Sequence, residues 1–325
     1  MRVRPGRGSR PRTRRRPAHS GAAGGFVTAV DRGRYACLVD DVVVIAMRAR
    51  ELGRKSVVVG DRVALAGDVS GAPDALARIV RVESRTSVLR RSPDDTDPVE
   101  RVVVANAEQL VIVSALADPQ PRPRFIDRCL VAAYDAGLAP VLCLTKADLA
   151  DPRDLLRAYE PLGLTCVVMR KPFGKKELGT LRRLLADQIS VFIGHSGVGK
   201  STLVNALVPA AERAVGRVNP VTGRGRHTSS SAIALPLPTG GWIIDTPGVR
   251  GFGLGHVAAD RVIRAFPDLE PGTAGCPPQC THLQDDCGLD AWVRSHHSER
   301  DRARLAARVD SLRRLLRSRE DAEDG

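Results

Sequence analysis

Two nucleotide-binding motifs occur in this chain in an unusual order. Residues 194–201 read GHSGVGKS and fit the Walker A pattern G-x-x-x-x-G-K-[ST], in which a glycine-rich loop holds phosphate groups. Residues 145–148 read TKAD and fit the [NT]-K-x-D pattern with which GTPases read guanine. In ordinary GTPases the guanine motif follows the phosphate loop, whereas here it precedes the loop. The order predicts a circularly permuted GTPase domain.

We expect the Walker loop to bind GTP or GDP together with Mg²⁺. An apolar run at 189–193 precedes the loop and a helical segment from Lys200 follows it, which is the strand–loop–helix context that the motif requires. Backbone N–H groups and the helix N-terminus attract phosphate, Lys200 reaches the β- and γ-phosphates, and the Ser201 hydroxyl ligates Mg²⁺. The predicted phosphate contacts are Gly194, Ser196, Gly197, Val198, Gly199, Lys200, Ser201 and Thr202.

A D-x-x-G pattern and a basic segment complete the predicted phosphate site. Asp245 would hold Mg²⁺ through water, and the Gly248 N–H would sense the γ-phosphate. The segment Gly223–Ser230 suits a switch loop in which Thr228, or Ser229 in its place, closes on Mg²⁺. The alternative for this segment is a flexible basic loop without that role.

The guanine motif predicts nucleotide specificity. Asp148 can accept hydrogen bonds from guanine N1–H and N2–H₂, which adenine does not offer, and an unpaired carboxylate in the site would reject ATP. Lys146 should pack over the base, and Thr145 fills the first motif position.

No glutamine follows the D-x-x-G pattern to orient the attacking water. His227, beside the switch threonine, is the internal candidate for this role, and a contact of this loop histidine with RNA is the alternative. The predicted catalytic residues are therefore His227, Thr228 and Lys200.

Composition shifts along the chain predict several domains in a protein of 325 residues. The tail at 1–25 is rich in arginine, lacks large apolar side chains and should be disordered, with arginines that either contact phosphates or are merely solvated. Short β-rich runs at 26–95 predict a small barrel. Strands alternating with helices at 101–255 predict a parallel α/β sheet, and 256–325 is mostly helical.

The formal net charge of +13 favours an electrostatic partner, most simply nucleic acid, although a basic compositional bias is the alternative. No apolar run reaches the length of a membrane-spanning helix, and no apolar segment follows the charged N-terminus as in a secretory signal. We therefore expect a cytoplasmic protein without a membrane partner.

Three cysteines and one histidine cluster near the C-terminus, at Cys276, Cys280, His282 and Cys287. Three thiolates and one imidazole suit structural Zn²⁺, and such a closed ligand set leaves no open position for catalysis. Incidental clustering is the alternative, and His296 and His297 are spare candidate ligands.

These motifs, taken in order, resemble the RsgA (YjeQ) family of small-ribosomal-subunit biogenesis GTPases. The resemblance runs through RTSVLRR at 85–91, the guanine motif, the Walker loop, GRHT at 225–228, DTPGVRGFGL at 245–254 and the Cys/His cluster. It implies an N-terminal OB-fold, a permuted GTPase domain and a C-terminal helical zinc domain. It also implies GTP hydrolysis under stimulation by the 30S subunit and its 16S rRNA during late subunit maturation. We expect the protein to be a monomer.

Three features depart from the family pattern. The guanine motif starts with Thr145 where the family usually has Asn, the Ser-Ala segment that backs guanine O6 is absent from 168–171, and each outer gap of the metal cluster is one residue short. Two other functions stay open on the residues alone: a regulatory GTPase that acts on a different RNA, and a non-enzymatic RNA-binding module.

Overall fold

The structure is a computed structural model that describes residues 21–53, 56–91, 101–209, 232–246, 254, 257 and 259–320. The predicted residues His227, Thr228 and Gly248 lie outside the described residues, as does most of the arginine-rich tail. No helix in the described part of the chain is long and apolar enough to cross a membrane.

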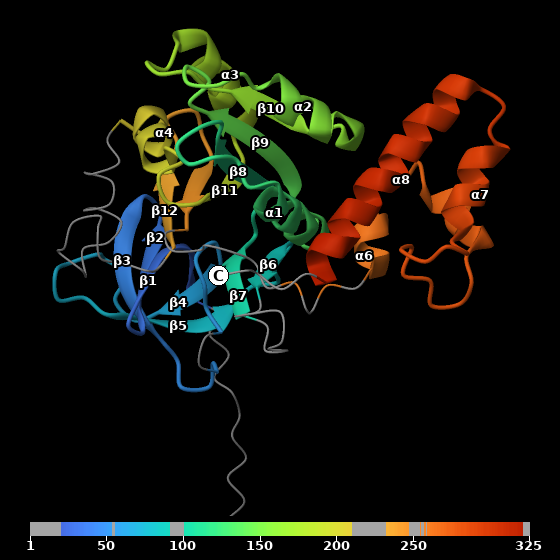
Figure 1. The fold of residues 1–325 in the computed structure, drawn as a ribbon. Helices are drawn as coiled ribbons and strands as arrows, with labels where there is room; N and C mark the ends of the chain where they lie inside the picture. The colour runs from blue at the N-terminus through green and yellow to red at the C-terminus, as the bar shows by residue number, and fades with distance from the viewer. Residues whose placement is uncertain are drawn as a thin grey trace, which may run out of the picture.

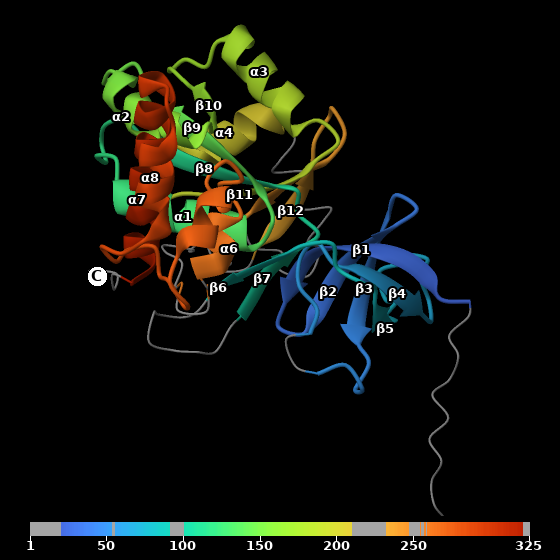
Figure 2. The same cartoon turned by 90° about the vertical axis from the view of Figure 1, so that its right-hand side faces the viewer.

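Five strands at the amino end close into a barrel (Figure 2). They are β1 (Ala23–Asp31), β2 (Arg34–Val39), β3 (Val42–Arg48), β4 (Arg62–Ala66) and β5 (Ala77–Val82). Their order is β1-β2-β3-β5-β4, β4 pairs back onto β1, and β3 and β5 run parallel. Alternate side chains fill a separate barrel core that includes Val27, Cys37, Val44 and Ile79. The predicted OB-type barrel is confirmed.

The composition of the run Val57–Leu65 predicts one β-strand, but β4 begins only at Arg62. A turn interrupts the run, because Gly60 has a φ of 91° and the Asp61 carboxylate accepts a 2.8 Å hydrogen bond from the Val58 N–H. A Cβ atom on Gly60 would lie 2.0 Å from the Ala105 carbonyl oxygen, so this close approach requires glycine.

A buried polar cluster, here called the barrel latch, ties this turn to the segments that leave the barrel. It consists of Asp61, Arg85 and Asn106. Arg85 Nε donates to Asp61 Oδ1 at 2.7 Å and Arg85 Nη2 donates to Asp61 Oδ2 at 2.9 Å. Asn106 Nδ2 donates to the Gly60 carbonyl at 2.9 Å, and Asn106 Oδ1 accepts the Thr86 N–H at 2.8 Å. A hairpin of β6 (Val88–Arg91) and β7 (Arg101–Ala105) follows.

Six strands form the central sheet. In spatial order they are β10 (Thr165–Val168), β9 (Ala139–Thr145), β8 (Gln109–Ala115), β11 (Ile189–Ile193), β13 (Trp242–Asp245) and β12 (Ile233–Pro236). The first five are parallel and β12 is antiparallel. One residue pair, Ala29 with Ile233, joins β12 to β1 and so connects the sheet to the barrel.

Helices cover both faces of this sheet, as the βα alternation predicts. On β8, Leu110 and Ile112 point to one core, whereas Val111 and Val113 point to the other. The first face is covered by α1 (Pro123–Asp135) and the second by α3 (Lys175–Leu185) and α4 (Lys200–Leu207). The short α2 (Arg153–Tyr159) and η1 (Glu160–Leu162) follow β9.

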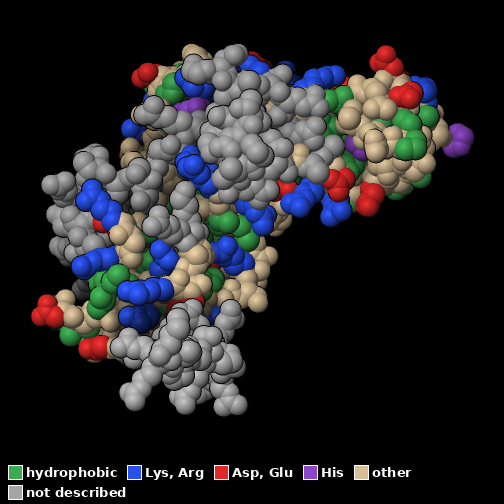
Figure 3. Space-filling view, turned by 90° about the horizontal axis from the view of Figure 1, so that it is seen from below, with side chains coloured by type: hydrophobic (Ala, Val, Ile, Leu, Met, Phe, Trp, Pro, Cys, Tyr) green, Lys and Arg blue, Asp and Glu red, His purple; other side chains and the backbone are tan. Residues whose placement is uncertain are grey.

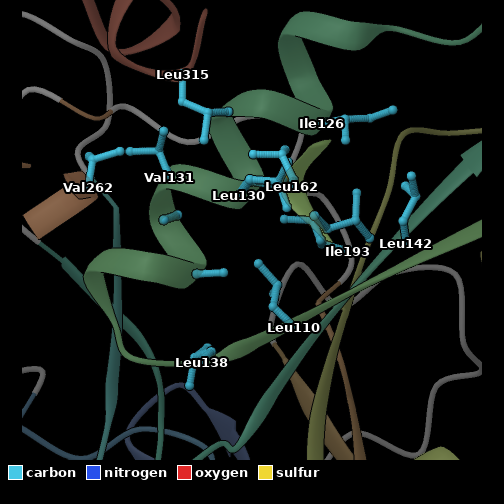
Figure 4. Close-up of a cluster of buried hydrophobic side chains, with 14 of the residues drawn as sticks. Leu110, Ile126, Leu130, Val131, Leu138, Leu142, Leu162, Ile193, Val262 and Leu315 are labelled. Carbon is cyan, nitrogen blue, oxygen red and sulfur yellow. The ribbon is translucent and has the colours of Figure 1, made fainter. Parts of the chain in front are cut away.

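The C-terminal elements are α6 (Ala259–Ile263), η2 (Glu270–Gly275), α7 (Gly288–Ser295) and α8 (Glu299–Glu320). Of these elements, α8 and α6 pack on α1, whereas α7 lies on the far side of α8 (Figure 1). One face of α8 contributes Leu305, Val309, Leu312, Leu315 and Leu316 to the same core as α1 and the sheet. Figure 4 shows Leu315 facing α1 on the side away from the strands.

Candidate functional site

The predicted Walker loop connects β11 to α4 with the geometry that the motif requires. Gly197 and Gly199 adopt φ values of 82° and 87°, in the left-handed region that favours glycine. A Cβ atom on Gly194 would lie 2.5 Å from the Val113 carbonyl oxygen of β8. Lys200 and Ser201 therefore open α4 directly behind a loop whose shape depends on its glycines.

Lys200 and Asp245 meet across the neighbouring strands β11 and β13. The Lys200 ammonium forms an ion pair with the Asp245 carboxylate, and both side chains are largely buried. The Thr246 hydroxyl donates to the Phe192 carbonyl at 2.9 Å and fixes the end of β13 against β11. The fold thus brings together the two residues predicted to serve the phosphates and Mg²⁺, at the carboxyl edge of the sheet where ligands of such folds bind.

The guanine motif lies beside the Walker loop although it precedes it in the chain. Thr145 Oγ1 donates to the Val198 carbonyl of the loop at 2.5 Å, so threonine in the first motif position holds the two motifs together. Lys146 has a φ of 58° and its ammonium donates to the Asp118 carbonyl.

Asp148 is exposed at the edge of this site rather than buried by protein. Its carboxylate accepts the Lys171 N–H at 2.9 Å, and this hydrogen bond lowers the pKa of Asp148. The carboxylate is therefore ionised and held in place, with its second oxygen left to accept donors from a base.

Residues 169–171 lie beside the guanine motif, in the region where no site residue could be assigned from the sequence. The Met169 N–H donates to the Leu144 carbonyl at 2.7 Å, and the Ala147 N–H donates to the Met169 carbonyl at 3.2 Å. These bonds place the segment along the guanine motif, in the position that the missing Ser-Ala segment would occupy. Its composition carries no signal, but its position directly after a strand that pairs with β9 could have indicated it.

The start of α1 supports the Walker loop from beneath. The His195 and Phe125 rings pack with centroids 4.1 Å apart. Burial, together with the nearby Arg122 guanidinium, lowers the pKa of His195. His195 is therefore a neutral packing residue of the loop near pH 7.

The four predicted metal ligands converge in one place. The ligand atoms of Cys276, Cys280, His282 and Cys287 all lie within 4.8 Å of one another. The Cys276 and Cys287 sulfurs are 3.9 Å apart, and His282 Nδ1 lies 3.6 Å from each. Tetrahedral Zn²⁺ with ordinary bond lengths needs ligand–ligand separations of about 3.5–3.8 Å. The shortened spacing therefore still gives a donor set that fits zinc.

The surroundings of the cluster fix its shape. Arg313 of α8 donates to the His282 carbonyl at 3.0 Å and makes two hydrogen bonds with the Asp290 carboxylate at 3.0 and 2.7 Å. His296, a spare candidate ligand, instead packs edge-on against Trp292 with ring centroids 4.7 Å apart.

Known proteins share both the sequence and the fold. A small ribosomal subunit biogenesis GTPase RsgA from Shewanella oneidensis is 38% identical over 283 residues, covering 83% of this chain and 79% of that protein. RsgA 1 from Vibrio parahaemolyticus is 40% identical over 242 residues, covering 72% and 67%.

Two solved structures resemble the fold at lower identity. YjeQ from Thermotoga maritima superposes with a TM-score of 0.62 at 24% identity over 89% of this chain and 98% of that one. The circularly permuted GTPase YloQ gives a TM-score of 0.61 at 22% identity over 94% and 98%. Residues 82–255 match the RsgA GTPase family, and with these relatives that match shows that the chain belongs to the RsgA GTPase family of GTP-hydrolysing enzymes.

Proposed function

We propose that this GTPase acts in the biogenesis of the small ribosomal subunit, in the cytoplasm, and that the subunit stimulates its hydrolysis of GTP. The proposal rests on the hydrogen bond between Thr145 and Val198, which joins the guanine motif to the Walker loop in a permuted sheet. Relatives that are named for this role support it. The net charge of +13 favours a partner rich in phosphate, such as 16S rRNA, and Figure 3 shows Lys and Arg side chains, with Asp and Glu among them, on the face seen from below.

The residues of the site have distinct roles in this proposal. The backbone N–H groups of the glycine-rich loop surround the phosphates. The Lys200 side chain leaves its ion pair with Asp245 and binds the β- and γ-phosphates. Ser201 and Asp245, with Thr228, hold Mg²⁺, which neutralises charge on the phosphates. Thr202 and the Gly248 N–H complete the contacts.

Asp148 confers guanine specificity, because its anchored carboxylate accepts hydrogen bonds that only guanine donates. Lys146 covers the base from the other side. Residues 169–171 form the wall beside the base, where the exposed Arg170 lines the same hollow as Asp148.

Hydrolysis needs an attacking water that is oriented in the site, and no glutamine follows the D-x-x-G pattern. We assign this role to His227, with Thr228 closing the switch loop when the subunit binds. Ordering of a loop by a partner raises the rate because phosphoryl transfer depends on positioning and electrostatics.

The Cys₃His cluster holds one structural Zn²⁺ in this proposal, since the donor atoms of Cys276, His282 and Cys287 already lie 3.6–3.9 Å apart, close to the separations of tetrahedral Zn²⁺. The metal fixes the loop between η2 and α7 and takes no part in hydrolysis. The protein acts as a monomer, and its contacts with the subunit involve the barrel, the zinc loop and α8.

The test is GTP hydrolysis with and without purified 30S subunits, with ATP, 50S subunits and tRNA as controls. We expect 30S subunits, but not 50S subunits or tRNA, to stimulate the hydrolysis of GTP and not that of ATP. This stimulated hydrolysis should be lost in Lys200→Ala. Lys175→Ala is the matched control, because Lys175 is an exposed lysine at the start of α3, outside the site. Stimulation by another RNA instead would favour a regulatory GTPase, and GTP binding without hydrolysis would favour a non-enzymatic RNA-binding module.

A further inference from the structure

A hollow of about 630 Å³ lies between the barrel and the central sheet. Gly24, Gly25 and Phe26 of β1 and Arg62 of β4 line one side, and Ile189 and Trp242 line the other. Ile189 and Trp242 are the first residues of β11 and β13, whereas the nucleotide motifs follow the last residues of these strands. The hollow is therefore at the opposite edge of the sheet from the GTP site.

The walls of this hollow are held in a fixed relation. The barrel latch joins Asp61 of the barrel to Arg85 and Asn106, next to two residues of the lining, Arg62 and Glu108. Glu108 is also fixed to β11, since its N–H donates to the Ile189 carbonyl at 2.9 Å. A rigid, largely preformed hollow is the usual form of a binding site for a small group.

The floor of the hollow is aromatic in a chain with few aromatic residues. Aromatic residues make up only 3% of the sequence, yet the rings of Phe26 and Trp242 pack here with centroids 5.0 Å apart and remain half-buried. Gly24 leaves the approach open, because no atom lies within 4 Å of the place where its Cβ would be. A flat ring can therefore reach both the aromatic pair and the backbone.

The polar groups at the rim have mixed charge. The exposed Arg62 lines the hollow together with Glu83, Glu108 and Asp187, and the Glu108 carboxylate accepts a hydrogen bond from the Ile189 N–H. Arg81, which pairs with Glu83 at 2.7 Å, adds a second cation beside the rim. This combination matches a nucleotide, whose base has a π-face and amino donors and whose phosphate is an anion.

We propose that the hollow binds one unstacked nucleotide of a single-stranded RNA segment. The base stacks on Trp242, its amino groups face the carboxylates, and its phosphate lies toward Arg62. The inference deepens the proposed function, on which its RNA partner rests. A cationic peptide would also suit the carboxylates, but the net charge of +13 disfavours it.

The experiment uses the full chain with Trp292→Phe, which leaves Trp242 as the sole tryptophan. GDP and Mg²⁺ are kept saturating so that the GTP site is filled, and short single-stranded RNA oligomers of one base type are titrated. We expect saturable quenching of Trp242 fluorescence. Binding of a labelled oligomer, followed by anisotropy, should weaken about tenfold in Phe26→Leu and in Trp242→Leu, in keeping with the loss of one stacked base.

Arg62→Gln should weaken binding and reduce the slope of log K against log salt by about one, as expected for one lost phosphate contact. Arg50→Gln is the matched control, because Arg50 is an exposed barrel arginine outside the hollow, and it should leave quenching unchanged. Three results would each overturn the inference. The first is that the RNA fails to bind, the second is that it binds without quenching Trp242 fluorescence, and the third is that an arginine-rich peptide but not RNA quenches that fluorescence. Quenching with no stimulation of hydrolysis by 30S subunits would overturn the ribosomal proposal and leave this site standing.

Discussion

The barrel and the C-terminal helices attach to the same central sheet in different ways. The barrel has a hydrophobic core of its own, and one residue pair between β1 and β12, the polar barrel latch and the contact of Phe26 with Trp242 join it to the sheet. The C-terminal helix α8 has no separate core, since its leucines extend the core of α1 and the sheet, as Figure 4 shows for Leu315.

This difference indicates which parts of the molecule can move independently of the others. A unit with its own core can shift as a body once a few polar contacts change, whereas a helix that completes another unit's core cannot leave without exposing apolar surface. We therefore regard the sheet, α1 and α8 as one cooperative unit, and the barrel as a second unit attached by the latch.

Two neighbouring arginines of α8 join this cooperative unit to the zinc loop. Arg313 bonds to the His282 carbonyl and Asp290, while Arg314 pairs with Asp127 of α1 at 3.1 Å and packs over the Tyr159 ring at 4.8 Å. One turn of helix thus connects the proposed metal site to the helix that supports the Walker loop.

The largest expected effect is that of metal removal, because structural zinc contributes about 10 kcal/mol or more in small zinc domains. We expect one zinc per chain and its loss in Cys287→Ser, with hydrogen exchange rising in 276–295. If α8 belongs to the same cooperative unit as the sheet, the backbone amides of α8 should stay protected from hydrogen exchange in Cys287→Ser, because Arg314 still pairs with Asp127.

The control for this experiment is His297→Ala, which alters an exposed histidine outside the cluster and should retain zinc. Full zinc content in Cys287→Ser would contradict the ligand assignment. Loss of protection throughout α8 would show that the zinc loop, rather than α1, holds the helix.

Two core substitutions test the comparison directly. Leu312 and Leu65 are almost fully buried, one in the shared core and one in the barrel core, and each change to alanine should cost about 2–5 kcal/mol of unfolding free energy. Leu312→Ala should raise hydrogen exchange in β8 and β11, whereas Leu65→Ala should raise it only in the barrel. Confinement of the Leu312→Ala effect to α8 would contradict the shared core.

Breaking the barrel latch should have a somewhat smaller effect. Arg85→Met leaves the fully buried Asp61 carboxylate without its cation, at a cost of about 3 kcal/mol. Exchange should rise in the barrel and at the seam but not in α8. Arg81→Met, which removes an exposed ion pair with Glu83, is the control and should change nothing measurable. Equal effects of the two substitutions would mean that the latch does not hold the barrel.

The features that could be predicted from the sequence are those whose residues lie close together in the chain. The Walker loop was predictable because its glycines, strand and helix are adjacent in the chain, and the metal ligands because they lie within twelve residues. The circular permutation followed from motif order alone, and the parallel sheet from the alternation of strands and helices.

Contacts between distant polar residues could not be predicted in this way. Arg85 pairs with Asp61 across 24 positions and Asn106 bonds to Gly60 across 46, and neither contact has a periodic signature. The same turn chemistry splits the run at 57–65, which apolar composition alone indicates as one strand. The proposed roles of His227 and Thr228, and the division of the chain at residues 25, 95 and 255, stay predictions.

The smallest effect concerns a buried charge within the shared unit. Burial raises the pKa of Asp127 to about 6, against the lowering influence of the Arg314 guanidinium. An unfolded aspartate has a pKa of about 3.9, so the folded protein binds the proton more tightly, and this residue's contribution to stability falls as pH rises from about 4 to about 6. Asp127→Asn should flatten this part of the pH dependence of unfolding free energy measured in urea. Asp154→Asn, a change at an exposed carboxylate of α2, should leave the slope as it is. An unchanged slope in Asp127→Asn would mean that Arg314 keeps the carboxylate ionised, and that the shared core tolerates a full ion pair between α1 and α8.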